Sequence, residues 1–117
     1  MYTFYHYPRC STCVKAKKWL NEQGLEYQAI NLADAPPTSD ELKQIHATSN
    51  KAIKALFNTS GQSYRNGGFK DRLASMSDDE KFAELAADGM LIKRPLLVGP
   101  NSSLIGFKIA EWEQLLG

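Results

Sequence analysis

Cys10 and Cys13 are the only two cysteines of the chain, and they lie at the junction of two differently patterned segments. The run before them, residues 2–7, is aromatic and predicts a strand, whereas residues 14–20 place apolar side chains at helical spacing. If the helix begins at or just after Cys10, both sulfur atoms lie in its first turn on one face, because positions three apart are neighbours on a helix. The pattern therefore predicts a redox-active thiol pair where a strand passes into a helix.

A cysteine at the start of a helix has a distinctive electrostatic environment. The first N–H groups of a helix are unpaired and together carry about half a positive charge, which favours a thiolate over a thiol. An ordinary cysteine is only about 3% thiolate at neutral pH, and the thiolate is the nucleophile. Arg9 and Lys15 add positive charge nearby in the sequence. We therefore expect Cys10 to be the nucleophile and Cys13, one turn into the helix, to be the resolving thiol.

Two other interpretations of the cysteines remain open from their spacing alone. They could be buried structural residues that fall three positions apart by chance. They could also bind zinc, but a structural zinc site usually has four Cys or His ligands. The chain adds only His6 and His46, which lack the close paired spacing of a zinc finger. The pattern favours redox chemistry and predicts no metal site.

The composition predicts a single globular domain over residues 1–117, long enough to bury a core. The net charge of +1 gives no indication of direct nucleic-acid binding. No apolar run approaches the roughly 20 residues of a membrane span, and the first residues do not resemble a secretory signal. These features predict a cytoplasmic protein, in which a C-x-x-C pair is more often catalytic, redox-sensing or metal-binding than a structural staple.

The first third of the chain predicts a βαβ unit. The helix that follows the cysteines ends before Gly24, and residues 25–31 then alternate apolar and polar side chains as a strand does. A strand, a helix and a second strand within about 30 residues indicate parallel strands joined by a right-handed crossover.

The middle of the chain, from about residue 36 to about residue 89, is predicted to be an all-helical insertion. Thr38 with Glu41, and Ser77 with Glu80, have the spacing of capping boxes that begin helices.

The end of the chain returns to strands. Residues 96–98 and 103–106 predict an antiparallel hairpin, and residues 109–116 a last helix. The order βαβ, helices, ββα predicts an α/β, thioredoxin-like fold: a four-stranded mixed sheet with an all-helical insertion.

Arg94 and Pro95 stand just before the third predicted strand, where a proline is tolerated. In thioredoxin-type folds the proline at this place is cis and lies beside the C-x-x-C pair, and the similarity of fold implies the same for Pro95. Arg94 then has two interpretations: a cation of the site, which would hold an anion or favour the Cys10 thiolate, or an ordinary surface arginine.

Three segments together resemble the ArsC/Spx family: Cys10-Ser11-Thr12-Cys13 with Lys15-Ala16, residues 57–61, and residues 91–99. The resemblance extends over nearly the whole chain, including the helical insertion. It implies one of two kinds of function. Arsenate reductases of this family use one cysteine to attack arsenate, which three arginines hold. Spx-type regulators bind the α subunit of RNA polymerase and use C-x-x-C as a redox switch.

The chain departs from the arsenate reductase pattern at the residues that hold the anion. Cys10 matches the nucleophile and Arg94 matches one arginine, but Asn58 stands where the second would fall. The third falls near Gly106 and Phe107, next to Lys108. If each charge-assisted hydrogen bond is worth about 1.5–3 kcal/mol, losing two weakens arsenate binding at least about a hundredfold. We therefore expect poor arsenate binding.

Two functions follow as hypotheses. The first is a thiol–disulfide reductase with Cys10, Cys13 and Arg94 as catalytic residues. Its remaining site residues, expected to bind substrate, are Ser11, Thr12, Pro95 and Asn58. It needs no bound cofactor, only an external thiol reductant such as thioredoxin or a glutathione/glutaredoxin system. The second is a redox-sensing regulator that binds the RNA polymerase α subunit. In either case we expect a monomer without direct nucleic-acid or membrane contacts.

Overall fold

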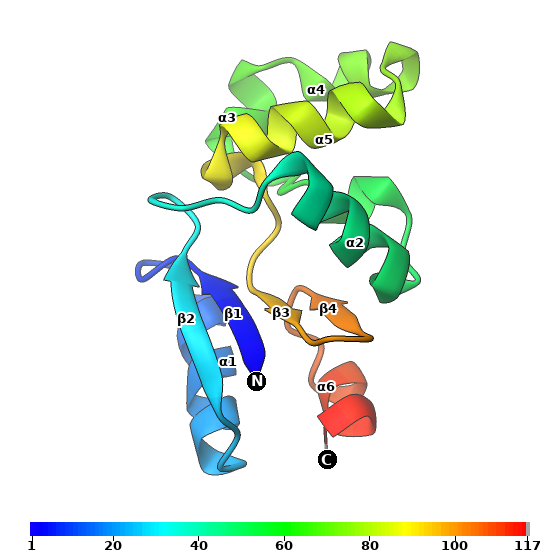
Figure 1. Cartoon of the computed structure of the whole chain (residues 1–117). Helices are drawn as coiled ribbons and strands as arrows, with labels where there is room; N and C mark the ends of the chain where they lie inside the picture. Colours follow the sequence, from blue (N-terminus) through cyan, green and yellow to red (C-terminus); the bar gives the residue numbers. More distant parts are fainter. Residues whose placement is uncertain (117) are drawn as a thin grey trace.

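The computed structural model describes residues 1–116. Its first elements are strand β1 (Tyr2–His6), helix α1 (Ser11–Glu22) and strand β2 (Tyr27–Asn31). The two strands are parallel neighbours, with Tyr2 opposite Tyr27. Gly24 ends the helix with a φ of +68°, a conformation that glycine adopts without strain. The predicted βαβ unit is confirmed (Figure 1).

Two short strands complete the sheet. Strand β3 (Leu96–Val98) is antiparallel to β1, and β4 (Ser103–Ile105) is antiparallel to β3, so the strand order is β2-β1-β3-β4. Only β1 and β2 form a parallel pair, which makes the sheet mixed. This is the predicted thioredoxin-like arrangement.

The segment between β2 and β3 is the predicted helical insertion, which lies at the upper end of the sheet in Figure 1. Its α-helices are α2 (Ser39–Ser49), α3 (Gln62–Asn66), α4 (Phe69–Arg72) and α5 (Asp78–Ala87). Short 3-10 helices occupy Ile53–Leu56, Leu73–Ser75 and Gly89–Leu91. One exception to the all-helical prediction is Phe57, which is extended and forms an isolated antiparallel bridge with Ile92.

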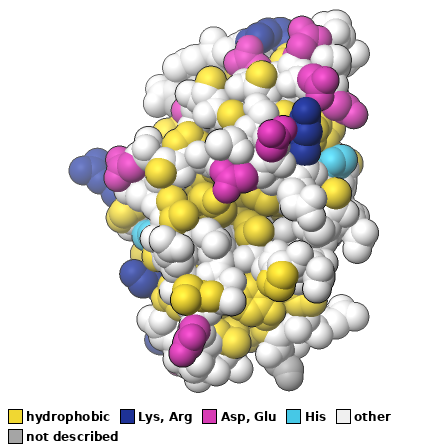
Figure 2. Space-filling view, viewed as in Figure 1, with side chains coloured by type: hydrophobic (Ala, Val, Ile, Leu, Met, Phe, Trp, Pro, Cys, Tyr) yellow, Lys and Arg dark blue, Asp and Glu magenta, His cyan; other side chains and the backbone are white. Residues whose placement is uncertain are grey.

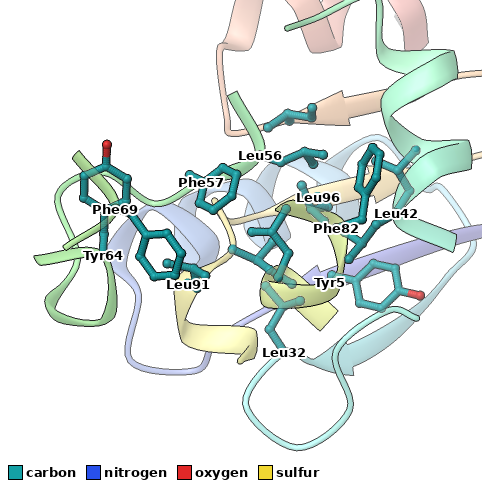
Figure 3. Close-up of a cluster of buried hydrophobic side chains, with 14 of the residues drawn as sticks. Tyr5, Leu32, Leu42, Leu56, Phe57, Tyr64, Phe69, Phe82, Leu91 and Leu96 are labelled. Atoms are coloured by element: carbon teal, nitrogen blue, oxygen red, sulfur yellow. The ribbon is translucent and has the colours of Figure 1, made fainter. Parts of the chain in front are cut away.

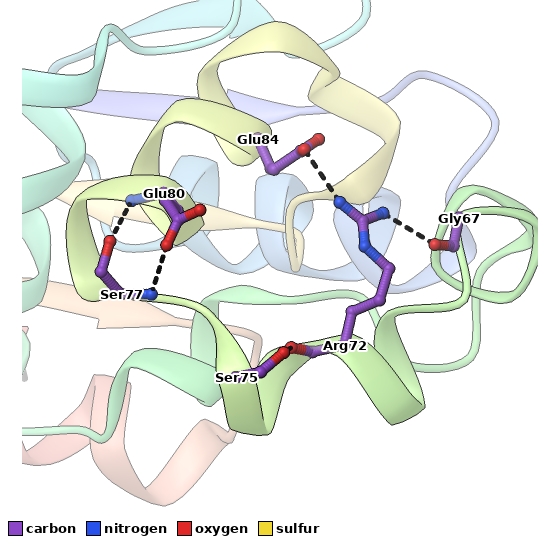
Figure 4. A network of polar contacts seen from close by, with 6 residues as sticks. All are labelled: Gly67, Arg72, Ser75, Ser77, Glu80 and Glu84. Carbon is purple, nitrogen blue, oxygen red and sulfur yellow. Dashed lines mark hydrogen bonds and ion pairs between the residues drawn. The ribbon is translucent and has the colours of Figure 1, made fainter.

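Both predicted capping boxes are present and begin α2 and α5. In the second, the Glu80 N–H donates to the Ser77 hydroxyl at 3.1 Å, and the Ser77 N–H donates to the Glu80 carboxylate at 2.8 Å (Figure 4). Nearby, the Arg72 guanidinium donates to the Gly67 carbonyl and to Glu84, and so ties α4 to α5. Local hydrogen bonds of this kind set where the helices of the insertion begin and how they join.

The sheet is buried on both faces. Phe4 packs with α1 and α6 (Ile109–Leu116) on one face, and its neighbour Tyr5 packs under the insertion on the other. The cluster around Tyr5 gathers side chains from every part of the insertion (Figure 3). A central strand that is aromatic on both faces suits this two-sided burial.

Trp112 anchors α6 and is fully buried. Its indole N–H donates to the Gly106 carbonyl at 3.0 Å, and its ring makes edge contacts with Phe107 and Trp19. Trp19 and Trp112 are therefore packing residues.

On the face seen in Figure 2, apolar side chains gather over the lower part, and most acidic side chains lie over the insertion. Among the described helices, none is both long and apolar enough to cross a membrane.

Candidate functional site

Cys10 is the N-cap residue of α1. Its backbone is extended, with φ −87° and ψ 115°, and the helix begins at Ser11. The Cys13 N–H donates to the Cys10 sulfur at 3.3 Å, so a sulfur atom takes the place of the oxygen that usually caps a helix. The prediction that the helix starts just after Cys10 and holds both cysteines in its first turn is confirmed. The N-terminus of a helix is a position that suits negatively charged groups.

Cys13 lies one turn along and is only 1% exposed, whereas Cys10 is half-buried, and both are free thiols. Burial raises the pKa of the Cys13 thiol to about 12, and its hydrogen bond with Cys10 acts in the same direction. The Tyr7 backbone and the positive charge of Arg94 oppose this rise. Cys13 is therefore the buried thiol of the pair, with a raised pKa, and Cys10 is the more exposed one.

Tyr7 connects the cysteines with Arg94. Its carbonyl accepts the Cys10 N–H at 3.0 Å, and its backbone acts to lower the pKa of the Cys13 thiol. The Arg94 guanidinium carbon lies 5.4 Å from the centre of the Tyr7 ring, within the range of a cation–π contact. Tyr7 is not among the expected catalytic or substrate-binding residues, although its position directly before the cysteine loop suggested that it lines the cleft.

Arg94 and Pro95 precede β3, whose first residue, Leu96, pairs with Tyr5 near the end of β1 that leads into the cysteine loop. The Arg94–Pro95 peptide bond is cis, and Pro95 is buried. Arg94 is half-buried, and its guanidinium donates to the Met90 carbonyl at 3.3 Å. The charge of Arg94 acts to lower the pKa of Cys13, so the guanidinium lies within electrostatic reach of the buried thiol.

The other predicted site residues are placed less closely together. Ser11 and Thr12 are exposed in the first turn of α1, between the two cysteines. Asn58 is half-buried, and its side chain lies against the Gly61 turn, where a Cβ on Gly61 would be 2.6 Å from the Asn58 amide nitrogen. Within the described residues, no hydrogen bond or ion pair joins Asn58 to either cysteine.

Near the position matched to the third arginine, the chain has a glycine, Gly106. Gly106 is buried with a φ of +73°, and its N–H donates to the Pro95 carbonyl at 2.8 Å. Lys108 is exposed and lines a separate pocket that does not include the cysteines. Of the three positions matched to anion-holding arginines, only position 94 is therefore an arginine in this chain.

His6 packs against Phe4, with the two rings stacked 5.3 Å apart. Burial lowers its pKa, and the charge of Lys17 lowers it further. His6 is therefore neutral at pH 7, which fits a structural role. In residues 1–116, no three His, Cys, Asp or Glu side chains gather closely enough to hold a metal ion.

The burial of Cys13 leads to a prediction for thiol labelling. Iodoacetamide should modify the native reduced protein at one site, Cys10, between pH 7 and pH 9, because Cys13 is buried and protonated there. Cys13 should react only after denaturation. Peptide mass spectrometry of native and unfolded samples measures this. Equal labelling of both cysteines in the native protein would contradict the assignment.

The raised pKa of Cys13 also predicts how the free energy of unfolding changes at high pH. The unfolded chain releases the Cys13 proton near its ordinary pKa, whereas the folded chain holds it up to about pH 12. The folded state therefore binds more protons in this interval, and its stability falls as the pH rises.

The chain is similar to several known proteins. A family model described as the ArsC family matches residues 5–115. YusI of Bacillus subtilis, described as uncharacterized, is 48% identical over 112 residues, which cover 96% of this chain and 95% of that protein. The regulatory protein MgsR of the same organism is 31% identical over 93% of this chain and 85% of its own length.

Among solved structures, an ArsC family related protein from Bacteroides fragilis superposes with a TM-score of 0.94. It is 45% identical, and the match covers 97% of this chain and 96% of the other. The family match covers most of the chain, and the related structure shares its fold. The chain belongs to the ArsC family.

Proposed function

We propose that this protein is a thiol–disulfide oxidoreductase in which Cys10 attacks and Cys13 resolves. The observation that carries the proposal is the difference in position, burial and pKa between the two thiols. Cys10 caps a helix and is half-buried, and Cys13 is buried and protonated one turn away. A nucleophile at a helix N-terminus with a second thiol in reach is the arrangement that disulfide exchange requires.

The reaction has two exchange steps. The Cys10 thiolate attacks one sulfur of a substrate disulfide, forms a mixed disulfide and releases the other sulfur as a thiolate. Cys13 then loses its proton, for which the released thiolate is a suitable acceptor, and attacks the Cys10 sulfur. This forms the Cys10–Cys13 disulfide and frees the second substrate thiol. An external dithiol, such as thioredoxin, or two glutathione molecules return both cysteines to the reduced state.

Residues around the pair would position the substrate. Arg94, held by the Met90 carbonyl and the Tyr7 ring, supplies a positive charge beside the thiols. Ser11 and Thr12 are exposed in the helix turn, and their backbone N–H groups precede the first helical hydrogen bond. Pro95 and Asn58 are proposed to border the substrate without contacting the sulfur atoms.

Arsenate is a poor substrate on this proposal. Only Arg94 of the three anion-holding positions is an arginine, and Asn58 and Gly106 cannot supply charge. Any arsenate turnover should therefore be at least about a hundredfold weaker than with three arginines.

Turnover assays test the proposal. The reduced protein should reduce a model disulfide with thioredoxin or glutathione as the electron source and accumulate the Cys10–Cys13 disulfide when the reductant is omitted. Arsenate should be turned over much more slowly. Absence of turnover on both substrates with both reductants would refute an enzymatic role.

A second candidate is a redox-sensing regulator, favoured by the 31% identity to the regulatory protein MgsR over 93% of this chain. The same cysteine pair would then change a surface that binds the RNA polymerase α subunit. Titration of the isolated α C-terminal domain with reduced and oxidised protein distinguishes the two candidates. A regulator should bind in one redox state, and an enzyme should bind in neither.

A further inference from the structure

A pocket of about 260 Å³, whose lining does not include the cysteines, is rich in lysine. Four of its eight lining residues are lysines, which come from distant parts of the sequence: Lys51, Lys54, Lys93 and Lys108. Phe57, Ile105 and Thr59 contribute much of the rest of the lining, and no carboxylate lines the pocket. Only 14 of the 117 residues are lysine or arginine, so the tertiary structure concentrates positive charge here.

The charges of this lysine pocket are largely uncompensated. Lys51 forms an ion pair with Glu111 at 2.8 Å. Lys54, Lys93 and Lys108 are exposed, and among the residues that the structure describes none of them has a carboxylate within 4.0 Å. Three like charges around one small pocket repel one another, and the attraction of an anion placed between them offsets that repulsion.

The pocket adjoins the cysteine site without belonging to it. Lys93 directly precedes Arg94, and the Lys93 side chain passes over Gly106, where a Cβ would lie 3.3 Å from the lysine Cε. Gly106 in turn donates its N–H to the Pro95 carbonyl. Neither cysteine lines the pocket, and Arg94 is directed to Tyr7 and Met90 instead.

We propose that the lysine pocket binds a small phosphate-bearing molecule. Lysine ammonium groups bind phosphate as point charges, and several around one pocket match the multiple charges of a phosphoryl group. The volume of about 260 Å³ is close to the lower end for small-ligand pockets and too small for a folded partner. Phe57 and Ile105 provide apolar contact for the carbon part of a phosphate ester, and the Thr59 hydroxyl provides a hydrogen bond.

Binding of inorganic pyrophosphate to the full reduced protein tests the proposal. Calorimetry at low ionic strength measures affinity, and ¹H–¹⁵N NMR shifts locate the site. The test variant combines Lys54→Gln, Lys93→Gln and Lys108→Gln. The matched control combines Lys15→Gln, Lys17→Gln and Lys18→Gln, which removes the same charge from the exposed face of α1. Circular dichroism establishes that both variants fold.

We expect saturable binding that weakens with added salt, with NMR shifts at Thr59, Lys93 and Lys108. The test variant should bind between about threefold and about 150-fold more weakly, since each of the three exposed ion pairs contributes roughly 0.2–1 kcal/mol. The control should change affinity less than about twofold. Glucose 6-phosphate should bind the same site, whereas glucose should not.

Three results would overturn the proposal. Equal weakening in both variants would show a response to net charge alone. NMR shifts centred on Cys10 and Arg94 would place the anion in the cysteine site. Binding of polyglutamate, with the same lysine dependence but without pyrophosphate binding, would identify a docking surface for acidic protein instead. None of these results depends on whether the cysteine pair has reductase activity.

Discussion

Replacement of Cys10 by serine should reduce disulfide turnover by about 10³-fold or more, because a hydroxyl is far less ionised than a thiol at neutral pH. Cys10 is the more exposed member of the pair, and its replacement leaves only the buried Cys13, whose pKa is raised. The substitution is nearly isosteric, and the serine hydroxyl can also accept the Cys13 N–H bond that caps α1. The loss should therefore occur without a large loss of stability.

Cys13→Ser is the matched control for this prediction. It leaves the attacking thiol in place and removes the resolving one, so the first exchange step should proceed and the mixed disulfide on Cys10 should accumulate. Mass spectrometry of the variant isolated from cells would identify the trapped protein or small thiol. Trapping by Cys10→Ser but not by Cys13→Ser would reverse the assigned roles, and equal turnover by all three forms would exclude both cysteines from the reaction.

Gly89→Ala is the substitution with the largest expected effect on stability. Gly89 opens the short helix after α5, and a Cβ at this position would lie 1.8 Å from the Leu32 carbonyl oxygen. That atom belongs to the backbone, so no side-chain rotation relieves the overlap. The insertion would have to move away from the end of β2 against a close-packed interior. We expect a loss of about 3 kcal/mol or more in the free energy of unfolding.

Gly24→Ala separates this steric effect from the conformational cost of losing a glycine. Gly24 has a φ of +68°, but no atom lies within 4 Å of the position of its Cβ. Alanine there should cost only about 1 kcal/mol. Guanidinium unfolding of both variants measures the difference. Similar midpoints for the two would show that the contact between Gly89 and Leu32 relaxes easily, whereas failure of Gly89→Ala alone to fold is the extreme form of the expected result.

The cysteine site was predictable because its main determinants are close in sequence. Two cysteines three positions apart, after an aromatic strand and before a helical pattern, are expected to lie in one turn of the helix. The capping boxes at Thr38 and Ser77 are equally local, and both form as predicted. The 3-10 helix at Ile53–Leu56 was less predictable, because its end depends on Phe57 pairing with Ile92, which lies 35 positions away.

The amino-acid sequence by itself determined the βαβ start, the hairpin, the helical insertion and the position of Cys10 at a helix cap, since propensity, spacing and capping act over a few residues. Tertiary structure alone decided the burial that raises the pKa of Cys13 and the placement of Arg94 over Tyr7. It also decided the gathering of Lys51, Lys54, Lys93 and Lys108 around one pocket. Such features depend on which distant segments pack together, and no local pattern records the distance between side chains that are dozens of residues apart.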